Sequence, residues 1–128
     1  MVIGLDGCKA GWVMVCWPHD TGKAPRAAII PTIHTAVNAG ASCIGVDMPI
    51  GFPCDTARAC ETLARKYIGP RRSSVFPVPC RDALMADDYP GACEINAGVL
   101  GKKVPKQTFM LFGKMREIDA IITPGLQS

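Results

Sequence analysis

The sequence lacks the segments that mark membrane and secreted proteins. No stretch reaches the roughly 18 consecutive apolar residues that a membrane span requires. The chain meets an acid already at Asp6, without the basic start and apolar run of a signal peptide. We therefore expect a cytoplasmic protein with no membrane partner.

The sequence also lacks the motifs of zinc sites and phosphate-binding loops. Its seven cysteines include no CxxC pair, and their odd number with no signal peptide disfavours a disulfide framework. We expect reduced thiols that act as small hydrophobic residues. No GxxxxGK[ST] loop is present, which argues against a P-loop nucleotide site.

What the chain does contain suits one domain, residues 1–128. Its 128 residues are 48% hydrophobic, which is enough to build a core. The net charge of +3 is mild, so an anionic partner such as nucleic acid is allowed but not required.

Short apolar runs predict four strands. Residues 2–5 and 11–17 resemble a hairpin joined by a glycine-containing turn, and residues 26–33 supply a third strand. A short helix fits residues 34–40. Residues 42–47 are continuously apolar until their final acid, which is typical of a strand covered on both faces and parallel to the first.

Helices are predicted for the second half of the chain. One is expected from a cap at Asp55 or Thr56 to Ile68, stopped by Gly69-Pro70. Residues 71–79 form a proline-flanked loop, and residues 89–100 and 106–122 suit further helices. The fold class is therefore α/β, with a mixed sheet of three antiparallel strands plus one parallel strand and flanking helices.

Asp6 and Asp47 each end a predicted strand and precede irregular backbone. If the two strands are adjacent and parallel, their carboxyl ends share one edge of the sheet and the carboxylates converge. Two close carboxylates repel unless a cation lies between them, and Mg²⁺ or Mn²⁺ would be suitable. The alternative is that each Asp caps a turn by accepting backbone hydrogen bonds.

Positive residues gather before and within the predicted loop. The strongest phosphate-binding candidates are Arg71, Arg72 and Ser73, together with Lys66 on the preceding helix, because arginine forks and hydroxyls suit phosphate oxygens. The alternative is a solvated helix face. Additional site candidates are Lys114, Glu117 and Asp119, whose spacing equally suits ion pairs along a helix.

Several motifs carry a resemblance to a known family. They are Gly-Leu-Asp-Gly-Cys-Lys-Ala-Gly-Trp-Val at residues 4–13, Val-Asp-Met-Pro-Ile-Gly-Phe-Pro at residues 46–53, and the segment at residues 64–77. The sequence resembles uncharacterised-domain family 429, described as predicted ribonuclease H-like nucleases. The resemblance implies a ribonuclease H-like fold whose central strand and neighbouring fourth strand carry metal-binding acids, matched here by Asp6 and Asp47.

The resemblance also implies that the chain is truncated. Family members continue into a further strand with a His-Pro-Glu-like segment, whereas residues 123–128 look like the linker before it. The final strand and a third acidic ligand would then lie beyond Ser128. The strand at residues 43–46 would have an open, uncharged edge, so we expect a homodimer through that edge, or a helix from residues 106–122 folded over it.

Three functions compete on this sequence. The first is a divalent-metal-dependent nuclease or phosphodiesterase acting on nucleic acid. The second is a catalytically inactive binding or assembly protein of the same fold, which would bind without a cation. The third, nucleotide-dependent phosphotransfer, is disfavoured because 128 residues leave no room for a second domain to close around ATP.

Overall fold

The computed structural model describes residues 1–127 and divides the chain into two compact units. Unit 1 comprises Met1–Met48 and the chain from Glu117 onward, and unit 2 comprises Pro49–Arg116. The chain passes from unit 1 to unit 2 after Met48, and it returns to unit 1 inside helix α6 (Phe112–Ile121). A single domain over residues 1–128 stays a prediction.

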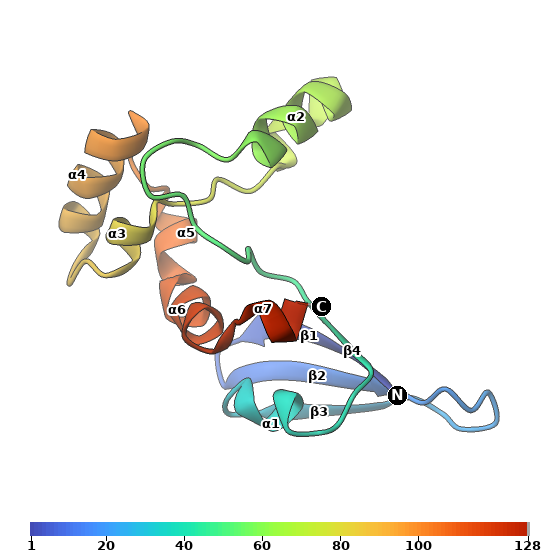
Figure 1. Cartoon of the computed structure of the whole chain (residues 1–128). Coiled ribbons are helices and arrows are strands. Elements are labelled where there is room, and N and C mark those ends of the chain that lie inside the picture. The colour runs from blue at the N-terminus through green and yellow to red at the C-terminus, as the bar shows by residue number, and fades with distance from the viewer. Residues whose placement is uncertain (128) are drawn as a thin grey trace. The chain divides into compact units, whose positions relative to one another are not determined.

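Unit 1 contains the expected mixed sheet. Its strands are β1 (Val2–Cys8), β2 (Gly11–Trp17), β3 (Arg26–Ile30) and β4 (Cys43–Val46), in the order β3-β2-β1-β4 (Figure 1). The first three strands are antiparallel neighbours, and β4 lies parallel to β1. The α/β class and the arrangement of three antiparallel strands plus one parallel strand are confirmed.

The first strand is longer than predicted. It extends to Cys8, and Asp6 pairs with Val13 inside the strand instead of ending it. Pairing continues because the turn is made later, just before Gly11. Gly11 has φ +137°, and a Cβ there would lie 2.1 Å from the Ile30 carbonyl oxygen, so only glycine fits where β2 passes β3.

Two other elements of unit 1 end earlier than predicted. β3 stops at Ile30, not at residue 33, because Pro31 has no N–H to continue the ladder. Helix α1 (His34–Val37) stops short of residue 40, since the Ala39 N–H already bonds the Ala36 carbonyl across a tight turn.

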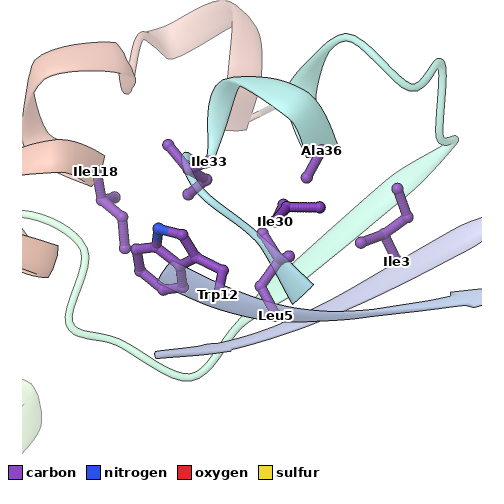
Figure 2. Packing of buried hydrophobic residues seen from close by; sticks show 7 residues of the cluster. All are labelled: Ile3, Leu5, Trp12, Ile30, Ile33, Ala36 and Ile118. Carbon is purple, nitrogen blue, oxygen red and sulfur yellow. The ribbon is translucent and has the colours of Figure 1, made fainter. Parts of the chain in front are cut away.

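One face of the sheet carries the core of unit 1. The cluster joins side chains from all three antiparallel strands to the α1 region and to Ile118 of α6 (Figure 2). Its members are Ile3, Leu5, Trp12, Ile30, Ile33, Ala36 and Ile118. Burial alternates along β1, so Val2, Gly4 and Asp6 lie on the opposite, exposed face.

Unit 2 is helical. It contains α2 (Ala59–Ile68), the 3₁₀ helix η1 (Gly69–Ser74), α3 (Arg81–Leu84), α4 (Tyr89–Leu100), α5 (Lys106–Met110) and the start of α6. Its largest fully buried side chains include Phe112, Leu84, Met115 and Val104. Helix α4 has the predicted bounds, because Asp88 accepts a hydrogen bond from the Gly91 N–H at 2.7 Å and Gly101 ends the helix at φ +72°.

Helix α2 begins later than predicted. It starts at Ala59, and neither Asp55 nor Thr56 caps it. Arg58 has an extended backbone and donates from Nη1 to the carbonyl oxygens of Ile50 and Gly51, both at 2.7 Å. This contact closes the preceding residues into a loop, so the helix cannot begin before Arg58.

The end of the chain also differs from the prediction. The helix expected over residues 106–122 is broken at Leu111, whose N–H bonds the Thr108 carbonyl in a tight turn between α5 and α6. Residues 69–74 form η1 at the start of the predicted loop. Residues 123–128 were expected to be a linker, but Pro124–Gln127 forms the short helix α7, and Ser128 lies outside the described residues. Within residues 1–127, no helix is long and apolar enough to cross a bilayer.

Candidate carboxylate site

The two predicted acids lie beside each other on neighbouring parallel strands. The β1–β4 ladder runs from Val2 opposite Cys43 to Leu5 opposite Val46, and Asp6 and Asp47 follow directly. The Asp47 N–H donates to the Leu5 carbonyl at 2.9 Å, which continues the ladder by one more bond. Neighbouring strands are about 4.8 Å apart, so the two acids have the close backbone spacing that the sequence argument required.

Both acids belong to the same face of the sheet. Leu5 belongs to the core cluster, and its paired residue Val46 packs against that cluster. Since successive side chains of a strand alternate between faces, Asp6 and Asp47 project from the opposite face, where both are exposed. The arrangement therefore exposes both carboxylates to solvent from neighbouring positions of the backbone.

Neither carboxylate has a protein partner. Among residues 1–127, no hydrogen bond or ion pair involves the side chain of Asp6 or Asp47. The turn-capping alternative requires each carboxylate to accept a hydrogen bond from a backbone N–H group, and neither Asp6 nor Asp47 accepts one from residues 1–127. Their oxygens are available to an external ligand.

The donor set of this pair fits a hard divalent cation. Mg²⁺ binds oxygen ligands, keeps several waters and is often held by one or two carboxylates together with substrate phosphates. In the described part of the chain, no group of three or more His, Cys, Asp or Glu side chains is placed to hold a metal. Two carboxylates with open water positions are thus the ligand set that the described residues offer.

Glu117, an additional candidate from the sequence, is engaged inside unit 1. Its Oε2 accepts from the indole Nε1 of Trp12 at 3.0 Å, and its Oε1 accepts from the backbone N–H of Ile33 at 2.6 Å. The carboxylate therefore links the middle of α6 to β2 and to the residue that precedes α1. This contact between residues 105 positions apart had no signal in the sequence.

The other two additional candidates fall in different units. Lys114 belongs to unit 2 and Asp119 to unit 1, although both are on α6. Both side chains are half-buried and have interactions within the protein. A role for either residue in a metal or phosphate site stays a prediction.

The predicted phosphate-binding residues gather at one end of α2. Lys66 lies in its last turn, and Arg71, Arg72 and Ser73 follow in η1. All four are exposed, as a phosphate-binding role requires. Their orientation toward Asp6 and Asp47 stays a prediction, because the basic residues belong to unit 2 and the acids to unit 1.

Arg58 and Glu61 form an ion pair within unit 2. The guanidinium donates from Nε to the two Glu61 oxygens at 3.0 and 3.1 Å, and Nη2 makes a further contact with Oε1. This hydrogen bonding lowers the pKa of the Glu61 carboxyl and raises the pKa of Arg58. The guanidinium of Arg58 is therefore engaged within the fold.

The comparison with known families agrees with the motif resemblance. Residues 4–127 match the family described as Protein of unknown function (DUF429), and the chain belongs to this family. No curated protein matches the sequence. No solved structure matches it either.

Proposed function

We propose that this protein is a divalent-metal-dependent phosphodiesterase acting on nucleic acid, with Asp6 and Asp47 as the ligands of Mg²⁺ or Mn²⁺. The observation that carries the proposal is the pair of exposed carboxylates on adjacent parallel strands, on one face, without protein partners. Such a pair is electrostatically unfavourable by itself and is stabilised by a bound cation.

The chemistry of such a site accounts for the choice of reaction. A divalent cation held by carboxylates polarises a phosphodiester and lowers the pKa of bound water. Asp6 and Asp47 would fix the cation at the sheet, and the rest of its coordination shell would remain open to water and to substrate phosphate. The exposed cations Arg71 and Arg72 suit the charge of a nucleic-acid backbone.

The first test separates cation binding from catalysis. Mn²⁺ would be titrated into the protein and its free fraction followed by electron paramagnetic resonance. Asp6→Asn and Asp47→Asn should each abolish the binding, whereas Asp87→Asn removes an equally exposed carboxylate from unit 2 and should leave it unchanged. Equal binding by all four proteins would exclude the carboxylate pair as a cation site.

The second test measures cleavage of labelled single- and double-stranded DNA and RNA. Cleavage should require Mg²⁺ or Mn²⁺, stop in EDTA, and fall about 100-fold or more in Asp6→Asn, which corresponds to roughly 2.7 kcal/mol of transition-state stabilisation. Binding of nucleic acid that is indifferent to cations, with no cleavage of any substrate, would instead support the binding or assembly alternative.

A further inference from the structure

Unit 2 contains a pocket of about 290 Å³ that the proposed carboxylate site does not use. Residues of α2 and of the segment just before it form one side of the pocket, and the loop after α4 forms another. Four prolines, two valines, a leucine and an alanine supply its apolar walls. An apolar concavity with a few polar groups is the usual form of a small-molecule site.

The charged groups around the pocket are mostly positive. Arg58, Arg65, Lys102 and Lys103 line it, and Glu61 is the single carboxylate among the lining residues. Glu61 is neutralised by its pair with Arg58. The charges of the other three cations are therefore uncompensated within the lining.

These three cations have no acidic partner elsewhere. Within residues 1–127, none of Arg65, Lys102 and Lys103 forms an ion pair with a carboxylate. Arg65 makes one long hydrogen bond, from Nη2 to the Val75 carbonyl at 3.4 Å, which leaves most of its guanidinium donors available. Like charges that converge on one concavity favour an anion within it.

Side-chain hydrogen bonds to two backbone carbonyls hold the loop that carries the two lysines. Asn96, which is buried, donates from Nδ2 to the Lys102 carbonyl at 2.7 Å and accepts from the Cys80 N–H at 2.8 Å. Two residues later, the Val104 carbonyl accepts from the Tyr89 hydroxyl at 2.9 Å. The backbone on both sides of Lys103 is thus fixed before any ligand arrives, which reduces the entropy lost on binding.

We propose that this pocket binds a phosphorylated small molecule of the nucleoside monophosphate class. The phosphate would lie between Arg65 and the two lysines, where charge-assisted hydrogen bonds from three sides suit its oxygens. The base or sugar would lie against the proline-rich walls. The pocket belongs to unit 2 alone, so the proposal goes beyond the proposed nuclease function and does not depend on Asp6 or Asp47.

The test is a titration of the full chain with adenosine 5′-monophosphate, followed by isothermal calorimetry and by amide chemical shifts. EDTA is present throughout, so failure of the metal-dependent activity cannot affect the result. Amide shifts should concentrate at Arg65 and at Gly101–Val104. Adenosine and inorganic phosphate, the two halves of the probe, should each bind at least about tenfold more weakly, since each gives up one set of contacts.

Substitutions identify the groups responsible. Lys102→Gln combined with Lys103→Gln should weaken binding of the nucleotide by about tenfold or more. Lys23→Gln, which removes a positive charge from an exposed residue of unit 1, should change it less than about twofold. Both lysines of the pocket are exposed, so the double variant should keep the parent's melting temperature. Absence of nucleotide binding by the parent chain, or equal weakening by the Lys23 control, would overturn the proposal.

Discussion

Replacing Glu117 by Ala is expected to destabilise unit 1 strongly. The substitution removes two hydrogen bonds to a charged acceptor, one from the indole of Trp12, which is 0% exposed, and one from the backbone N–H of Ile33, which is 2% exposed. A hydrogen bond to a charged group contributes about 1.5–3 kcal/mol. The loss of both should lower the free energy of unfolding by about 3–5 kcal/mol, and Tm by roughly 12–20 °C for a chain of this size.

Urea unfolding followed by tryptophan fluorescence is the appropriate assay. Both tryptophans, Trp12 and Trp17, belong to unit 1, so the signal reports the unit in which the substitution lies. Asp47→Ala, measured in EDTA, is the matched control, since it removes an exposed carboxylate without a protein partner from the same unit, and it should change stability by less than about 0.5 kcal/mol.

A double-mutant cycle isolates the contact with the indole. Trp12→Phe removes the N–H donor, and its combination with Glu117→Ala should give a coupling energy of about 1–2 kcal/mol. A loss below about 1 kcal/mol in Glu117→Ala alone would refute the conclusion that this carboxylate fastens α6 to the sheet.

Three further predictions follow from the same structure. Glu61→Gln should lower stability at neutral pH, and the difference from the parent should shrink as the pH falls below 4.5. The reason is that pairing with Arg58 holds the pKa of Glu61 below this ordinary value, so the stabilisation is lost when the carboxylate is protonated. Unfolding followed by circular dichroism across pH 3–7 measures this difference, and a difference that does not change with pH would contradict the prediction. Gly11→Ala should lower the free energy of unfolding by at least about 2 kcal/mol, because the added Cβ would clash with the Ile30 carbonyl oxygen. Urea unfolding measures this loss, and an unchanged unfolding curve would show that β2 and β3 can move apart to accept the Cβ. The chain should form a homodimer through β4, because this strand pairs with β1 on one side and with no strand of residues 1–127 on the other. Light scattering should give twice the mass of one chain for the parent and the mass of a single chain for Cys43→Lys. A monomeric parent would contradict the prediction.

The sequence by itself determined the elements whose causes are local. Helix α4 was predicted with the correct bounds, because Asp88 at its start and Gly101 at its end act on backbone groups only a few residues away. The strand order followed from the hairpin signal and from the continuous apolar run before Asp47. Adjacency of Asp6 and Asp47 was therefore predictable, since it depends only on two parallel strands being neighbours.

Element ends were mispredicted where a side-chain contact or a tight turn decided them. Helix α2 begins at Ala59 because the Arg58 side chain bonds backbone carbonyls at residues 50 and 51, and residue types near the helix start do not reveal such a contact. The break at Leu111 follows from a tight turn to Thr108 within a stretch whose pattern suits one continuous helix.

Only the tertiary structure decided which polar groups are engaged and which are available. Glu117 looked like a candidate for a site, but long-range contacts with Trp12 and Ile33 tie it into the fold. Arg65 and Lys103, which are far apart in the chain, instead line one pocket without an acidic partner. Local pattern determines helices and strands because their hydrogen bonds join near neighbours, whereas the availability of a side chain depends on every segment that folds against it.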